Sequence, residues 1–118
     1  MRGKRPRQSA LQLSVFDPAK DHTGSALLGF PCLQQVSLTY RKRGELEMHA
    51  YYPTQYVFDR AYGNYLGLCQ LGVMIAHLLH LKLVKFTCYI PTPELGSASK
   101  SDLTDLKNLV QSKIAILK

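Results

Sequence analysis

Cys32 stands out among the residues that could do chemistry, because cysteine is the one good nucleophile in a chain with few catalytic groups. Pro31 precedes it. A proline fixes its own φ and restricts the residue before it, so the backbone sets the direction of the thiol. A thiol held in this way could attack an electrophilic carbon in a cavity. It could equally pack as a small apolar side chain, which is common for cysteine. The residues alone leave both interpretations open.

The other potential metal ligands predict no metal site. Three cysteines without a C-x-x-C spacing argue against a disulfide framework and against zinc, and they favour a reducing cytoplasm. His77 and His80 have a spacing that metal ligands use, but no third ligand is placed to join them. We therefore expect Cys69 and Cys88 to pack in the core and the two histidines to face solvent.

Length and charge limit the classes of function. The chain has 118 residues, enough for one domain with a core but not for two. A net charge of +7 attracts polyanions, and basic residues gather near the N-terminus and in residues 41–43. Neither cluster is interleaved with stacking aromatics, so nucleic-acid binding is the weaker alternative. The most apolar stretch, residues 65–81, is interrupted by polar residues and is too short for a membrane span.

Alternation of apolar and polar residues predicts four strands. Two of them flank Arg41-Lys42-Arg43-Gly44, where glycine can take a positive φ, and this is typical of a β-hairpin. The fourth strand places Val84, Phe86 and Cys88 on one face. The expected segments are a flexible basic arm (1–9), a single domain (10–118), strands at 11–15, 35–40, 45–52 and 84–90, and a loop at 17–30.

Two helices complete the prediction. Apolar residues recur at steps of three and four in residues 60–81, on so much of the circumference that we expect this helix to be buried under the sheet. A last helix, capped by Ser101, carries one apolar stripe. The order of elements predicts an α+β fold, a mostly antiparallel or mixed sheet packed by both helices.

The order of these pieces resembles the C-terminal half of thymidylate synthase, in particular the shorter archaeal-type enzymes. The resemblance runs from about Ser9 to the last helix. Asp17-Pro18 ends a strand, Phe30-Pro31-Cys32-Leu33 opens another, residues 40–48 match the family's hairpin, and residues 61–68 match its buried helix with an asparagine, Asn64. The resemblance implies a thymidylate-synthase-like fold and a homodimer that associates through the faces of its sheets.

The resemblance also implies chemistry on a pyrimidine nucleotide such as deoxyuridylate. The thiolate of Cys32 would add to C6 of the base, and C5 would then attack the one-carbon unit of methylene-tetrahydrofolate. A side-chain amide both donates and accepts, so Asn64 would read the base. Asn64 could instead cap backbone N–H groups at the start of the helix.

Some family residues have no counterpart. Pro53 stands where the family has a phosphate-binding arginine, while Thr54 keeps a hydroxyl. Arg5 and Arg7 lie close to the positions of two further phosphate arginines. The family's N-terminal half has no match, so the chain could be the C-terminal part of a longer protein or could begin naturally at Met1, and we do not expect it to make thymidylate alone. A scaffold of the same fold that binds a nucleotide or a partner protein without catalysis is the alternative.

Overall fold

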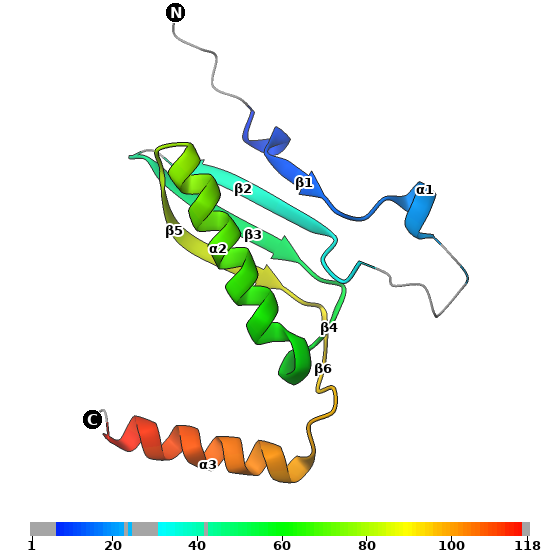
Figure 1. The fold of residues 1–118 in the computed structure, drawn as a ribbon, viewed down its shortest axis with the longest axis vertical. Coiled ribbons are helices and arrows are strands. Elements are labelled where there is room, and N and C mark those ends of the chain that lie inside the picture. The colour runs from blue at the N-terminus through cyan, green and yellow to red at the C-terminus, as the bar shows by residue number, and fades with distance from the viewer. Residues whose placement is uncertain (1–6, 23, 25–30, 42, 117–118) are drawn as a thin grey trace, which may run out of the picture.

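A computed structural model describes residues 7–22, 24, 31–41 and 43–116, and it has an α+β fold with a mixed sheet (Figure 1). One long helix covers a face of the sheet and a second helix lies apart. In chain order the elements are η1 (Gln8–Ala10), β1 (Gln12–Ser14), α1 (Pro18–Asp21), β2 (Gln35–Arg41), β3 (Glu45–Tyr51), β4 (Thr54–Tyr56), η2 (Val57–Ala61), α2 (Tyr62–Leu78), β5 (Lys82–Tyr89), β6 (Thr92–Glu94) and α3 (Lys100–Ile116).

The main sheet has the strand order β1-β2-β3-β5. The predicted hairpin is confirmed, because β2 and β3 pair antiparallel from Gln35 opposite Tyr51 to Arg41 opposite Glu45. In the connecting turn, Arg43 and Gly44 both have positive φ, as a tight hairpin turn requires. β5 then pairs parallel with β3, and α2 is the crossover between them.

A bulge in β5 corrects the predicted inward face of this strand. The register with β3 shifts between Leu46 and Glu47, and the partners of these residues are Leu83 and Lys85. Val84 is skipped, so it is exposed, whereas Leu83 packs against the core. A bulge adds one residue to one strand, so the side chains before and after it alternate out of phase between the two faces of the sheet. A sequence pattern with a period of two does not predict this shift.

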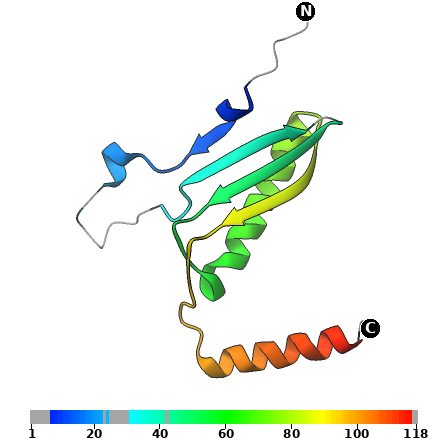
Figure 2. The same ribbon diagram turned by 180° about the vertical axis from the view of Figure 1, so that it is seen from behind.

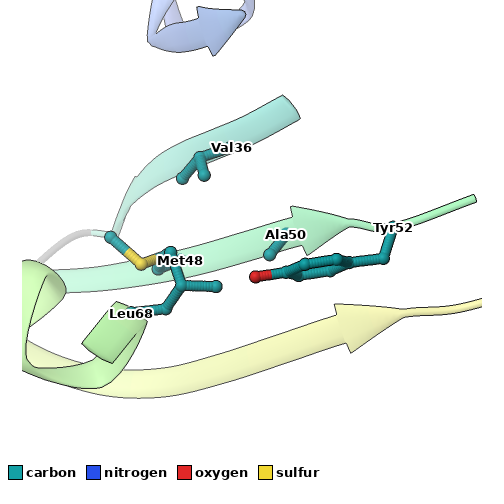
Figure 3. Close-up of a cluster of buried hydrophobic side chains, with 5 residues drawn as sticks. All are labelled: Val36, Met48, Ala50, Tyr52 and Leu68. Atoms are coloured by element: carbon teal, nitrogen blue, oxygen red, sulfur yellow. The ribbon is translucent and has the colours of Figure 1, made fainter. Parts of the chain in front are cut away.

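The core lies between the sheet and α2 (Figure 3). Figure 3 shows the Tyr52 ring extending along this layer, with its hydroxyl pointing toward Leu68 of α2. Gly72 lets α2 approach the sheet, because a Cβ there would meet Leu83 Cδ2 at 3.0 Å and Met48 Cε at 3.2 Å. The buried members of the cluster are Val36, Met48, Ala50, Tyr52 and Leu68.

α2 is buried on one face only, which corrects the expectation that it is covered on most of its circumference. Leu68, Gly72 and Ala76 are buried against the sheet. On the other side, Val73 and Leu78 keep 57% and 69% of their surface exposed. Because the helix is apolar on its outer face as well, this face is suited to pack against a further element. No element of the described part of the chain packs there.

α3 does not pack on the sheet, contrary to the sequence expectation, and extends away from the body (Figures 1 and 2). Its first turn is capped by Ser99, not by the expected Ser101. Ser99 Oγ accepts from Asp102 N at 3.2 Å, and Ser99 N donates to the Asp102 carboxylate at 2.8 Å, which forms a capping box. Ser101 lies inside the first turn.

A short parallel pair, β4 with β6, joins the start of α2 to the segment before α3. The Asp59 carboxylate accepts from Ser97 N at 2.9 Å and from Ser97 Oγ at 2.6 Å. Gly96 has φ +80°, and a Cβ there would lie 2.3 Å from Asp59 Oδ2, so only glycine fits. These contacts, the Asp59–Ser97 clamp, fix how the chain leaves the sheet.

The N-terminal expectations are met in part. Gln8–Ala10 form a 3₁₀ turn, and the Gln8 amide donates to Tyr40 O at 2.9 Å, so the end of the expected arm contacts β2. α1 forms inside the expected loop at 17–30, where the Asp17 side chain caps its first turn. Residues 1–6 and 25–30 lie outside the described part of the chain.

Candidate functional site

An open pocket of about 620 Å³ lies where β3 ends and α2 begins. This volume is typical of small-molecule sites, which have about 300–1,000 Å³. Its walls are mostly apolar. They also contain a few polar groups, which come from the segment before β2, the end of β3, β4, η2 and α2. Its polar lining residues include Cys32, Tyr52, Gln55, Arg60 and Asn64. We call this the Cys32 pocket.

Cys32 is exposed and lines this pocket, just before β2 begins. The side chain is therefore presented to a cavity and not enclosed among aliphatic residues. Cys88, by comparison, is half-buried against the core, and burial raises the pKa of its thiol, which disfavours the thiolate. The expectation that Cys88 packs in the core is confirmed, while Cys69 is half-buried on α2.

Asn64 lies in the first turn of α2 and is half-buried in the wall of the Cys32 pocket. The capping alternative is wrong, because Ala61 is the N-cap of α2 and no side chain caps this end. Thus the two residues singled out by the sequence, Cys32 and Asn64, line the same cavity although they are far apart in the chain.

Arg60 is the charged residue that the sequence interpretation missed. It lies in η2, a π-helical turn, and such turns occur frequently at functional sites. Its side chain is exposed, and among the described residues no carboxylate forms an ion pair with it. Arg60 precedes Asn64 by four residues, and this spacing on a helical segment was the available signal. A guanidinium here can bind an anionic group at the mouth of the pocket.

Gln55 supplies a buried amide in the pocket wall. Only 3% of its surface is exposed, and its Oε1 accepts a hydrogen bond from the Tyr65 hydroxyl at 3.1 Å. Its Nε2 has no partner in the described part of the chain. A buried donor without an acceptor costs about 1–3 kcal/mol, so a ligand acceptor that reached it would be favoured.

Two tyrosines keep their protons in this region. Burial raises the pKa of Tyr52 to about 12, with smaller contributions from Cys88, Cys32 and Tyr65. Burial also raises the pKa of Tyr65, and Cys88 adds to this effect. Both phenols are therefore hydrogen-bond donors at neutral pH, and neither is a base.

Two further predicted site residues, Thr54 and Arg7, do not line the pocket. Thr54 is exposed on β4, on the side opposite to Gln55. Arg7 precedes η1, which contacts the Tyr40 end of β2. Cys32 precedes the other end of this seven-residue strand, so roughly 20 Å separate the two ends. Arg5 lies outside the described residues.

No metal-binding group of three ligands occurs among residues 7–22, 24, 31–41 and 43–116. His77 and His80 are both exposed, as the sequence predicted. The helices of the described segments are each too short or too polar to cross a bilayer.

Comparison of the chain with protein-family models, with curated proteins and with solved structures found no match.

Proposed function

We propose that the Cys32 pocket binds a pyrimidine 5′-nucleotide and that the Cys32 thiolate adds to C6 of its base. The observation that carries this proposal is that Cys32, Asn64 and Arg60 line one cavity. Cys32 comes from the segment before β2, and Arg60 and Asn64 come from the adjoining η2 and α2. Together they supply a nucleophile, a cation for a phosphate and an amide that can pair with a base edge.

Each part of such a nucleotide has a complementary group. The apolar walls suit the faces of the base, and the amides of Asn64 and Gln55 suit its carbonyl and N–H groups. The phosphate fits Arg60. This residue would replace the family's phosphate-binding arginine, whose position is occupied here by Pro53. Hydrogen bonds to charged groups contribute about 1.5–3 kcal/mol each, so one guanidinium supports binding of moderate strength.

The residues of the pocket do not fit methylene-tetrahydrofolate. This co-substrate carries carboxylates of its own, and Arg60 is the single cation among the described lining residues. We therefore assign no residue of this chain to the folate and derive no step through it. A folate bound by another chain would provide the one-carbon unit.

A non-catalytic nucleotide-binding scaffold is the second candidate. Pro53 favours it, because a pyrrolidine ring offers no donor to a phosphate and its carbonyl is already bonded to Thr92 N at 3.2 Å. This candidate shares the binding step with the first and lacks the covalent step. The nucleic-acid alternative receives no support from the hairpin, where Arg41 is paired with Glu47 at 3.1 Å.

Nucleotide binding is tested by thermal denaturation with deoxyuridylate, deoxycytidylate and inorganic phosphate. A ligand that binds the folded state raises Tm by mass action. We expect deoxyuridylate to raise Tm, and Arg60→Gln to weaken its affinity by about 10- to 100-fold, as loss of a charge-assisted hydrogen bond predicts. Arg43→Gln, which removes the same charge at the hairpin turn, is the matched control and should have no effect. If no nucleotide shifts Tm, the proposal is wrong.

The covalent step is tested with 5-fluorodeoxyuridylate alone, because the pocket does not fit the folate: the thiolate adds to C6, the C5–C6 double bond opens and C5 takes up a proton. Mass spectrometry should find an adduct on Cys32 and none on Cys69 or Cys88. Cys32→Ser should bind the nucleotide with unchanged affinity and form no adduct. Binding without an adduct in the unmodified chain would select the non-catalytic scaffold.

A further inference from the structure

We propose that α3 docks on the outer face of α2 of a second copy of this chain, and that two copies exchange these helices about a twofold axis. The proposal is independent of the nucleotide site. It rests on two apolar helical surfaces that nothing in the described chain covers.

The first surface is the outer face of α2. The seventeen residues of α2 include no Asp, Glu, Lys or Arg. Leu66, Val73 and Met74 keep about half of their surface exposed on this side, at 47%, 57% and 53%. A shallow apolar groove runs beside Val73 and Met74 and includes Cys69 and His77. Helical faces that meet water normally carry charges, so this one is built for contact with apolar side chains.

The second surface is the stripe along α3. Leu106, Val110 and Ile114 share one side of the helix and are exposed by 43%, 47% and 51%. An isolated helix of seventeen residues that is not rich in alanine is marginal in water, and most helical stability in proteins comes from packing of an apolar face. The capping box at Ser99 supports only the first turn, so α3 needs a surface to pack on.

The two surfaces match in length and in charge. Each helix has seventeen residues, about 25 Å. α3 carries three lysines and two aspartates; Lys107 and Lys113 flank the stripe, where a long side chain can keep its ammonium group in water, and α2 carries no Asp, Glu, Lys or Arg. An α2–α3 contact would therefore bury apolar groups without burying an ionised one.

The geometry of the chain favours a second copy over packing within one chain. The Asp59–Ser97 clamp and Gly96 fix how the chain leaves β6, and α3 then projects away from its own α2 (Figures 1 and 2). A helix about 25 Å long and 10 Å wide presents roughly 250 Å² of projected face. Two α2–α3 contacts involve four such faces, or about 1,000 Å², which reaches the lower limit for a specific interface.

The test is the mass of the full chain in solution, measured by sedimentation equilibrium, with variants on each surface. The unmodified chain should have twice its 13.3 kDa mass. Leu106→Glu with Val110→Glu should give a monomer, because it charges the stripe of α3. Asn108→Glu with Ser112→Glu adds the same charge to the opposite side of α3 and should leave the dimer intact. Val73→Glu on α2 should also give a monomer.

Far-UV circular dichroism separates dissociation from misfolding. On dilution of the unmodified chain, or in the monomeric variants, the helical signal of α3 should fall while the thermal transition of the sheet and α2 remains. A monomeric unmodified chain would overturn the proposal, since α3 would then pack within one chain or remain unpacked. A dimer that persists in either the α2 or the α3 variant would also overturn it and would place the interface on another face.

Discussion

At the scale of single residues, the most informative pair is Gln55 and Tyr65. The Oε1 of the buried Gln55 amide is hydrogen-bonded, but its Nε2 has no partner in the described part of the chain. This is unusual, because polar groups in protein interiors are almost always hydrogen-bonded. Such a group weakens folding, and a ligand acceptor that reached it would recover part of this cost. The energetic role of this pair and its binding role can be measured separately.

A double-mutant cycle measures the energetic role. Tyr65→Phe should destabilise the fold by about 1–2 kcal/mol, because it leaves Gln55 Oε1 without its donor. Gln55→Met should have a smaller effect, since it also removes the unsatisfied Nε2. The double variant should cost less than the sum of the two, with the difference measured by urea denaturation. Additive effects would show that the two side chains do not interact in solution.

The candidate site illustrates what the sequence does and does not predict. Pro31-Cys32 and Asn64 were predicted from a pattern of residue types in order, and the structure brings both to one pocket. Arg60 and Gln55 were missed because their roles depend on the π-helical turn and on the β4–β6 pairing. Both are irregular features, and the four-residue spacing of Arg60 and Asn64 was the one signal of them in the sequence.

At the scale of elements, local pairing was predictable and helix docking was not. The hairpin turn and the two helices follow from glycine, alternation and apolar spacing. Contacts between distant segments decide the rest: the bulge at Val84 belongs to the pairing of β5 with β3, and the Asp59–Ser97 clamp sets the direction in which the chain leaves β6 toward α3. An apolar stripe indicates that a helix needs a partner, but it does not say which surface that partner is.

The clamp itself can be tested through Gly96. Gly96→Ala should open it, because a non-glycine residue at this φ costs about 1–2 kcal/mol and its Cβ would overlap the Asp59 carboxylate. The expected result is faster hydrogen exchange at the Ser97 amide. Gly67→Ala is the control, since it adds a methyl group in open space within α2 and should raise stability by about 1 kcal/mol without changing exchange at Ser97. Unchanged exchange in Gly96→Ala would show that the clamp is not formed in solution.

At the scale of the whole molecule, one thin core holds the sheet and α2 together, so a change at its centre affects global unfolding. Tyr52 lies in this core with 3% of its surface exposed. Its side chain connects the end of β3 to α2, and this is also the end of the core that borders the Cys32 pocket.

Tyr52 should therefore govern alkaline stability. Because the pKa of Tyr52 is raised in the folded state to about 12, its contribution to stability is complete below the ordinary value near 10 and is lost as the pH rises through 12. Urea denaturation between pH 9 and pH 12 should show this loss, and Tyr52→Phe should flatten the profile. An identical slope in both proteins would contradict the assignment.

The open edge of the main sheet has a consequence for the behaviour of this protein at high concentration. β5 is eight residues long and borders no further strand of the described chain, so its outer row of amide and carbonyl groups is a template for intermolecular pairing. Lys82 and Lys85 place positive charge along that edge, and the bulge between them interrupts its regularity. Charges and a bulge at an edge are typical of strands that resist intermolecular pairing, so we expect aggregation to increase as salt screens the two lysines.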